Sequence, residues 1–409
     1  MTEIYRNDLI YSVSYALDFV EQDLVMVAPH HSKRVALLSA LMGRTMGFSG
    51  EELLNLAVCG ALHDNALTEY RQLRAAAGRA AEPEAFSGDL GLHCSLGEAN
   101  IARLSFYPQV KEAILCHHEN ADGSGPFGRT AAETPAFARL IHMADSVDAR
   151  FDASRMNPDK FCAARAFVRE NTGSLYDAET ADAFARSFSA PEELALDLDT
   201  LDRPLRVELP EVRALYSPEE VIRLADFFAK IIDYKSRFTY THSTGLAQKA
   251  ARMAAYYGWS EDMQARLYLA GALHDVGKLM VPSDILEKPG KLTAEEFEQI
   301  KEHARGSFRV LHSIRGLDEV GRWAYHHHEK LDGSGYPFGK TAAELGPQER
   351  LMACLDIYQA LREDRPYRAG MSHGQAMDIL ISMVRGGQLD PQIVEDIGIC
   401  FCRQPEPAA

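Results

Sequence analysis

The chain has 409 residues, of which 46% are hydrophobic and 25% are charged, a composition typical of two or three folded domains that excludes wholesale disorder. Its 59 acidic and 43 basic residues give a formal net charge of −16, which excludes DNA and RNA polymers as partners because such binding depends on Lys and Arg at phosphates. With no membrane-length apolar run, no signal-peptide pattern and seven scattered cysteines, we expect a cytoplasmic protein without a membrane segment or a disulfide framework.

One pattern occurs twice along the chain. The matching strings are GALHD at 60–64 and 271–275, HHENADGSG at 117–125 with HHEKLDGSG at 327–335, and FGRTAAE at 127–133 with FGKTAAE at 338–344. Collinear matches at a shift of 210 or 211 residues indicate a tandem duplication. We therefore expect two copies, 1–190 and 217–409, joined by a linker at 191–216.

Apolar residues at three- and four-residue intervals predict helices in both copies. In chain order, the clearest examples are 32–47, 245–258 and 295–311. Gly47 and Gly258 stand where C-terminal caps of the first two helices belong.

The connector carries three prolines, which disfavour one continuous helix. A short strand or a packed arm is the alternative to a free linker. Alternating strand patterns are nearly absent elsewhere, so the predicted fold class is all-α.

The second copy holds a set of imidazoles and carboxylates on separate predicted helices. They are His242, His274, Asp275, His303, His327, His328 and Asp356. Such ligands suit Fe, Mn, Ni or Zn, and the lack of Cys among them argues against a structural zinc site. Seven ligands exceed the needs of one metal, so we expect two divalent transition metals that share one carboxylate, an arrangement suited to displacement at phosphorus. A lone histidine on a helix is more often a surface or core residue, but the set recurs in register in the first copy.

The second copy also carries longer motifs around these ligands. They read HDVGK at 274–278, HHEKLDGSGYP at 327–337 and RPYR at 365–368. The pattern resembles the HD-GYP family of HD-domain phosphohydrolases over 217–400, with a degraded copy over 8–190. The resemblance implies two HD-type helical domains and a phosphodiesterase that hydrolyses a cyclic dinucleotide. Cyclic di-GMP is the first expectation for the substrate, with linear pGpG or GMP as product, and cyclic GMP-AMP is the alternative.

The resemblance also assigns the ligands. One metal would be held by His242, His274, Asp275 and Asp356, and the other by Asp275, His303, His327 and His328, with Asp275 as the bridge. Fe or Mn is the first expectation for the metals, and Ni or Zn is the alternative. Two cations would neutralise the phosphodiester oxygens and make hydroxide available near neutral pH.

The expected catalytic residues are Asp275 and Lys278. Lys278 lies four residues after His274, so on an α-helix it would share that ligand's face, and we assign it to the phosphate. Tyr336 is a candidate substrate contact. Arg365 and Arg368 would clamp the second phosphate or a guanine edge, with a surface turn as the alternative.

Two positions depart from the family pattern. Trinuclear members carry Glu where this chain has Phe238, so we expect two metals and not three. The second Asp of a D-x-x-D-A motif is replaced by Gln359, which we expect to be compatible with activity.

The first copy keeps an equivalent of every ligand. These candidates for a second metal site are His31, His63, Asp64, His93, His117, His118 and Asp145. Leu67 stands in place of Lys278, and neither the tyrosine nor RPYR has a counterpart. Our hypothesis is a metal-binding but catalytically weak domain that regulates or scaffolds the other. The alternatives are vestigial histidines and a second active site for another phosphoester.

Two other functions stay open for the whole chain. One is hydrolysis of a nucleotide or another phosphomonoester. The other is a catalytically silent sensor that binds a cyclic dinucleotide and reports it to a protein. A second copy of the chain or a signalling protein is the candidate partner.

Overall fold

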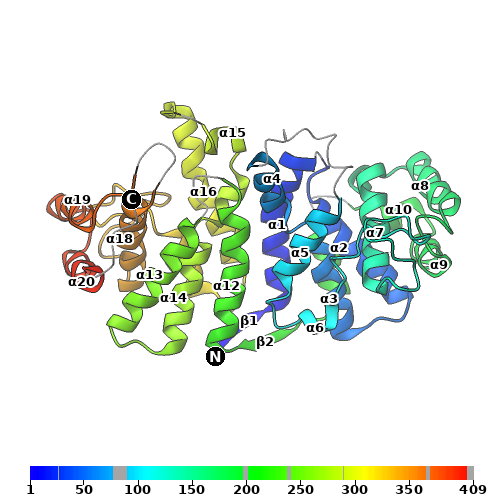
Figure 1. Ribbon diagram of the computed structural model, residues 1–409, viewed down its shortest axis with the longest axis horizontal. Helices are drawn as coiled ribbons and strands as arrows, with labels where there is room; N and C mark the ends of the chain where they lie inside the picture. The colour runs from blue at the N-terminus through cyan, green and yellow to red at the C-terminus, as the bar shows by residue number, and fades with distance from the viewer. Residues whose placement is uncertain are drawn as a thin grey trace. The chain divides into compact units, whose positions relative to one another are not determined.

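The computed structural model of the protein describes residues 1–25, 27–76, 90–196, 201–236, 241–288, 290–364 and 369–402. These residues form helices with two short strands, and the all-α prediction is confirmed (Figure 1). The chain divides into two compact units. We call Tyr5–Arg213 the first lobe, and Met1–Ile4 together with Ala214–Ala409 the second lobe.

The first lobe is built around one buried helix. Its helices are α1 (Arg6–Val25), α2 (His31–Thr45), α3 (Gly50–Ala61), α4 (Leu67–Ala76), α5 (Leu90–Ile101), α6 (Tyr107–Val110), α7 (Ala136–Phe151), η2 (Ala153–Arg155), α8 (Pro158–Glu170), α9 (Ala178–Ser187), α10 (Pro191–Leu194) and α11 (Asp202–Glu208). Helix α2 packs against α1, α3, α7 and α9. It is buried on nearly every side, as expected of a helix enclosed by others.

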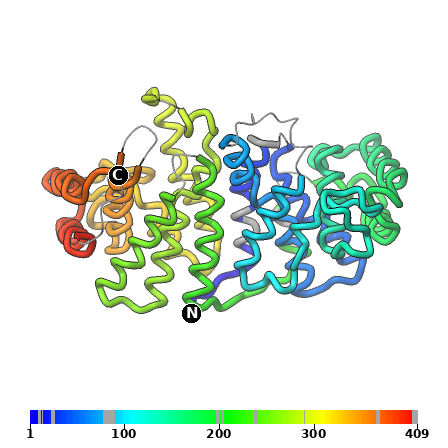
Figure 2. The backbone as a smooth tube through the Cα atoms, in the orientation of Figure 1, coloured from blue at the N-terminus to red at the C-terminus, as the bar shows by residue number. Residues whose placement is uncertain are grey.

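The second lobe is built from a similar series of helices. Its elements are β1 (Thr2–Tyr5), β2 (Arg213–Tyr216), α12 (Pro218–Asp233), α13 (His242–Tyr256), α14 (Glu261–Leu273), η3 (Val276–Met280), α15 (Ser283–Leu286), α16 (Ala294–His312), α17 (Asp318–Tyr325), α18 (Pro347–Arg362), α19 (His373–Arg385) and α20 (Pro391–Phe401). The tube in Figure 2 shows α12, α13 and α14 side by side, and α14 packs against the other two and against α17. The helices predicted at 32–47, 245–258 and 295–311 correspond to α2, α13 and α16.

The helix ends follow the sequence signals. Gly47 and Gly258 adopt positive φ angles of 97° and 68° just after α2 and α13, a backbone conformation that glycine tolerates best. Thr293 and Glu296 form a capping box at the start of α16.

The connector is not one helix. Its described residues form α10, α11 and strand β2, and its side chains Leu194, Leu205 and Leu209 are buried. Strand β2 pairs with β1 from the beginning of the chain in a two-stranded sheet. Residues up to Arg213 thus fold with the first copy, whereas residues 1–4 fold with the second.

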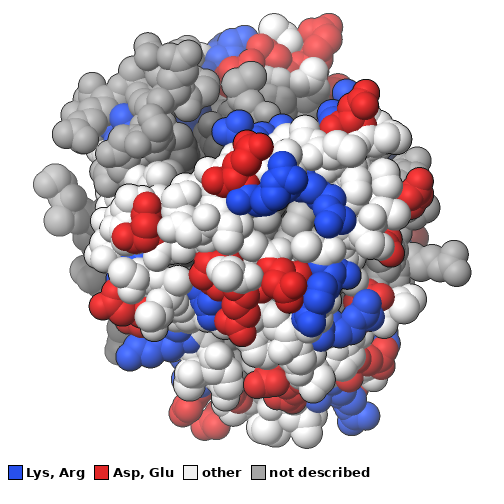
Figure 3. Space-filling view, turned by 90° about the vertical axis from the view of Figure 1, so that its right-hand side faces the viewer, with Lys and Arg blue, Asp and Glu red and all other residues white. Residues whose placement is uncertain are grey.

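Among the described residues, no helix is long and apolar enough to cross a membrane. On the face in Figure 3, acidic and basic side chains are interspersed with neutral ones.

Candidate metal centre

Five segments of the second lobe bring the seven predicted ligands together. His242 is the first residue of α13, His303 lies within α16, and Asp356 lies within α18. His274 and Asp275 directly follow α14, and His327 and His328 follow α17. The turns after α14 and α17 therefore place two ligands each beside ligands from three other helices.

Asp275 lies between the two groups of histidines. Its Oδ2 is 3.0 Å from Nε2 of His274, and its Oδ1 is 3.4 Å from Nε2 of His303 and 3.9 Å from Nε2 of His327. The two oxygens of one carboxylate thus face different imidazoles, as a bridging ligand requires.

Asp356 faces both groups as well. Its Oδ1 is 3.1 Å from Nε2 of His242, and its Oδ2 is 3.7 Å from Nδ1 of His328. The donor atoms of His242, His274 and Asp356 all lie within 4.8 Å of one another, and so do those of His303, His327 and His328. Each triad belongs to one of the two ligand sets that the resemblance implies, and Asp275 is the residue that both sets share.

Hydrogen bonds fix the orientation of four of the imidazoles. Nδ1 of His274 lies 2.8 Å from the carbonyl oxygen of Gly271, and Nδ1 of His327 lies 2.6 Å from that of Ala324. Nδ1 of His303 faces the carbonyl oxygen of Ile300, one turn earlier on α16. A carbonyl can only accept, so we assign the proton to Nδ1, which leaves the Nε2 lone pair facing the centre. For His242, the acceptor is a carboxylate of Glu363, 2.9 Å from Nδ1.

The centre is buried and its polar atoms lack partners. Nε2 of His274, His303 and His327 and Oδ1 of Asp275 are buried and make no hydrogen bond. Unpaired buried polar atoms are costly, and one explanation is an ion that completes the site. Burial lowers the pKa of His303 to about 4 and that of His328 to about 3, which keeps both imidazoles neutral and able to donate a lone pair. The donor set therefore fits divalent metals.

Two motif glycines allow these helices to approach. A Cβ on Gly271 of α14 would lie 2.6 Å from Cα of Ala247 on α13, so only glycine lets the two helices pack this closely. A Cβ on Gly277 would overlap the carbonyl oxygen of His303. The glycines of GALHD and HDVGK thus bring His274 and Asp275 up to their neighbours.

Lys278 does not lie on a continuing α-helix, and that part of the sequence prediction is wrong. Helix α14 ends at Leu273, and Lys278 lies on the 3₁₀ helix η3. Three residues make one turn of such a helix, so the Lys278 ammonium meets the carboxylate of Asp275. Its side chain is 21% exposed, which leaves it accessible to a ligand.

Tyr336 lies beside the histidines. Its ring centroid is 4.6 Å from that of His328, and its backbone N–H donates to the His328 carbonyl oxygen. Gln359 is buried and accepts a hydrogen bond from Lys249 at 2.6 Å. Arg365, Arg368 and Phe238 lie outside the described residues.

The first lobe builds a related cluster. His31, His63 and Asp145 form one triad of donor atoms within 4.8 Å, and His93 and His117 belong to another group with His118. Oδ1 of Asp64 lies 3.5 Å from Nε2 of His93 and 3.9 Å from Nε2 of His117. All seven predicted positions of the first copy are therefore gathered in one region.

Sequence reasoning missed three side chains at these centres. Glu363 orients His242, and Asp148 lies 2.7 Å from Nδ1 of His31 in the first lobe. Cys94 joins the first-lobe group of His93, His117 and His118. Asp148 completes a D-x-x-D-A motif with Asp145, a signal that the sequence did contain.

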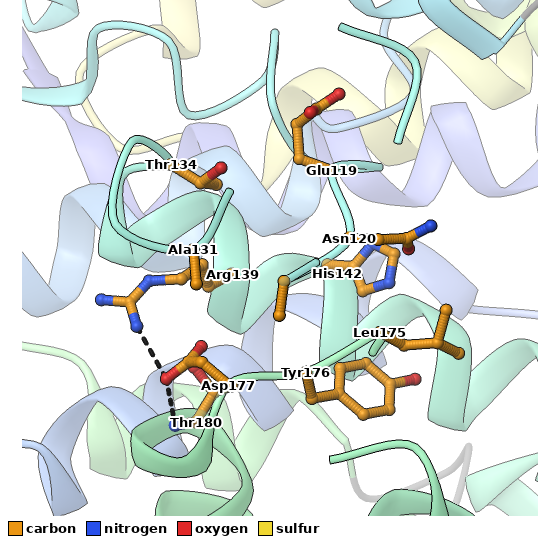
Figure 4. Close-up of a pocket in the computed structure, with 11 residues that line it drawn as sticks. Glu119, Asn120, Ala131, Thr134, Arg139, His142, Leu175, Tyr176, Asp177 and Thr180 are labelled. Carbon is orange, nitrogen blue, oxygen red and sulfur yellow. Dashed lines mark hydrogen bonds and ion pairs between the residues drawn. The ribbon is translucent and has the colours of Figure 1, made fainter. Parts of the chain in front are cut away.

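A small pocket in the first lobe borders the donor groups without including any of the predicted ligands, since its lining residue His142 lies 3.0 Å from the carbonyl oxygen of His117. His142, Tyr176 and Arg139 are among its lining residues, and the ion pair of Arg139 with Asp177 crosses one side of it (Figure 4). The free space is that of about one ordered water molecule. It is too small for a nucleotide.

The chain matches known families and proteins along most of its length. Two models described as HD domain match residues 30–150 and 226–393. The chain is 29% identical to a 3′3′-cGAMP-specific phosphodiesterase 1 of Vibrio cholerae over 95% of this chain and 90% of the relative. It is 35% identical to a cyclic di-GMP phosphodiesterase of Pseudomonas aeruginosa over 40% of each protein.

A solved structure shares the fold. The crystal structure of a cyclic GMP-AMP-specific phosphodiesterase of V. cholerae, V-cGAP3, matches with a TM-score of 0.66 at 22% identity, over 98% of this chain and 99% of that one. The family is identified by the two HD-domain matches, by the sequence similarity to the V. cholerae phosphodiesterase 1 over most of both chains, and by the motifs around the centre. The chain belongs to the HD-GYP family of HD-domain phosphohydrolases and carries two HD domains in tandem.

Proposed function

We propose that the protein is a metal-dependent phosphodiesterase that hydrolyses a cyclic dinucleotide, with its active site in the second lobe. The observation that carries this proposal is the convergence of imidazoles and carboxylates from five segments around Asp275. One metal would be held by His242, His274, Asp275 and Asp356, and the other by Asp275, His303, His327 and His328. When bound, two such ions supply positive charge for the phosphodiester oxygens and lower the pKa of water.

The chain's own side chains would position the substrate. We assign the Lys278 ammonium, which lies at the edge of the centre beside Asp275, to a phosphate oxygen, where a charged donor stabilises developing negative charge. Tyr336 would contact the substrate from its place beside His328. Arg365 and Arg368 would bind the second phosphate or a guanine edge.

We propose two candidate substrates and rank them. Cyclic di-GMP is the first, with linear pGpG or GMP as the product. Cyclic GMP-AMP is the second candidate, because the similarity to the V. cholerae 3′3′-cGAMP-specific enzyme spans both lobes, whereas the P. aeruginosa cyclic di-GMP enzyme matches 40% of this chain. Fe or Mn would be the metal in the second lobe, with Ni or Zn as the alternative, because imidazole and carboxylate ligands suit all four.

For the first lobe, we propose a metal-binding domain with little catalytic activity of its own. Its donor groups are assembled, but Leu67 is buried at the position that matches Lys278. The first lobe therefore lacks the charged donor that we assign to the phosphate in the second lobe. Regulation or scaffolding of the second lobe is the role that remains for it.

The deciding experiment combines metal analysis with product analysis. Protein purified without oxygen is assayed for bound metals and then incubated with each cyclic dinucleotide, and the products are separated by chromatography. We expect linear dinucleotide or mononucleotide from at least one substrate. Release of free phosphate from monoesters, with both cyclic dinucleotides untouched, would contradict the proposal. Tight binding of a cyclic dinucleotide to fully metallated protein, without turnover, would identify a sensor instead.

A further inference from the structure

A cysteine lies within the donor group of the first lobe. Cys94 follows His93 on α5 and is fully buried. Its Sγ is 3.6 Å from Nε2 of His93, and its donor atom lies within 4.8 Å of those of His117 and His118. The matching position of the second lobe is Ala304, so the thiol is specific to the first lobe.

The separations between donor atoms fit one small ion. Metal–nitrogen bonds of 2.0–2.1 Å and a metal–sulfur bond of about 2.3 Å place tetrahedral ligand atoms about 3.3–3.6 Å apart. In the first lobe, Nε2 of His93 is 3.4 Å from Nε2 of His117 and 3.6 Å from Sγ of Cys94. Both distances match this requirement before any side chain moves.

The surrounding polar atoms point to an ion as well. Nε2 of His63 is buried without a hydrogen-bond partner, in a side chain that is 1% exposed, and its ring centroid is 5.4 Å from that of His117. Oδ1 of Asp64 also makes no hydrogen bond and lies 3.5 Å from Nε2 of His93. Nδ1 of His117 faces the carbonyl oxygen of Ile114 at 2.6 Å, so its Nε2 lone pair is the one available for coordination.

We propose that the first lobe binds a thiophilic divalent ion of the zinc type through the Cys94 thiolate and the imidazoles of His93, His117 and His118. Soft thiolate ligands favour zinc over manganese, whereas the second lobe offers only nitrogen and oxygen. The thiol gives up its proton to solvent as the metal–sulfur bond forms. The two lobes would therefore differ in metal preference, and this inference does not depend on catalysis by either lobe.

Cobalt substitution tests the proposal directly, because a thiolate bound to Co²⁺ gives a charge-transfer absorption that nitrogen and oxygen ligands do not. The full-length chain is prepared with its less buried thiols, Cys162, Cys400 and Cys402, changed to serine, and is loaded with Co²⁺. We expect the thiolate band in this protein and its loss in the Cys94→Ala variant. Alanine fits because the folded second lobe carries Ala304 at that place.

The matched control is Cys116→Ala, a change at a second buried thiol of the first lobe, next to His117, that is not part of the donor group. We expect it to keep the band. Bound Co²⁺ without a thiolate band, or a band that survives Cys94→Ala, would overturn the proposal. Loss of the band in the His93→Ala variant would support it further.

Discussion

Glu363 accepts a hydrogen bond from Nδ1 of His242 at 2.9 Å, and in the first lobe Asp148 does the same for His31 at 2.7 Å. The two acids do not stand at matching positions. Asp148 matches Gln359, and Glu363 comes one helical turn later, at the end of α18. The orienting carboxylate has moved by four residues, which keeps it on the same side of the helix.

The residues around Gln359 also differ from those around Asp148, the matching residue of the first lobe. In the first lobe, Arg34 forms an ion pair with Asp148 at 2.7 Å. The matching residue of the second lobe is Gly245, and Gln359 fills that space, since a Cβ on Gly245 would lie 2.4 Å from its Nε2. Lys249 instead supplies a cation to Gln359.

We predict that Glu363→Ala weakens metal binding by the second lobe by about 10- to 100-fold, the usual effect of losing a carboxylate that orients a ligand histidine. Titration of metal-free protein with Mn²⁺, followed by electron paramagnetic resonance, measures the affinity. Asp378→Asn is the control, because that acid is exposed on α19. Gln359→Asp added to Glu363→Ala should restore part of the affinity, because it recreates the first-lobe arrangement with Lys249 as the cation. Unchanged affinity in Glu363→Ala would show that this hydrogen bond does not position the ligand.

Replacement of the bridging acid should remove activity together with metal. We predict that Asp275→Ala, like His274→Ala, abolishes turnover of cyclic dinucleotide and lowers the metal content, because the Asp275 carboxylate lies within 4.0 Å of four imidazoles. Metal analysis and product chromatography on the same sample provide the measurement. Full activity in the Asp275 variant would end the two-metal mechanism.

Lys278 should matter for turnover more than for metal content. We predict that Lys278→Ala lowers kcat by about 10²-fold, the effect of losing one donor to developing charge, while the metal content stays near that of the parent protein. Its ammonium contacts Asp275 but is not a metal ligand, since a protonated amine has no lone pair to give. Undiminished turnover in this variant would locate activity elsewhere, and the first lobe would be the next place to look.

Packing of α14 against α13 should depend on Gly271. We predict that Gly271→Val lowers the free energy of unfolding by about 1–3 kcal/mol, because the added atoms would meet the backbone of Ala247. Gly374→Ala on α19 is the control, because its Cβ would meet no atom within 4 Å. Urea denaturation measures both. Equal stability of the two variants would argue against a tight helix contact at this glycine.

Metal removal should lower stability. Buried nitrogens of His274, His303 and His327 make no hydrogen bond, so metals bound there stabilise the folded chain. We predict that a chelator lowers the thermal midpoint and that added Mn²⁺ restores it. At a hundredfold excess of Mn²⁺ over Kd, the free energy of unfolding should rise by about 2.7 kcal/mol per site. A midpoint indifferent to both additions would contradict metal binding at these residues.

Much of the fold could be predicted because helical periodicity is local, and the repeated motifs marked the ligands of both lobes. The strand pair β1 and β2 could not, since each strand has four residues and they lie about two hundred residues apart. Glu363 and Cys94 were missed because each occurs in one copy only, so comparison of the copies gives no signal. The position of Lys278 was misjudged because nothing in HDVGK distinguishes a 3₁₀ turn from an α-helical one.

The pairing of β1 with β2 has a topological consequence. The polypeptide starts in one unit, leaves it after Ile4, builds the whole other unit and returns at Ala214. The first lobe is thus an insertion bounded by two adjacent strands, and the gap between Ile4 and Ala214 is one that a short turn could span. A single protease cut inside the first lobe would leave both fragments attached to the second, whereas joining Ile4 to Ala214 would delete the lobe without creating a new chain end.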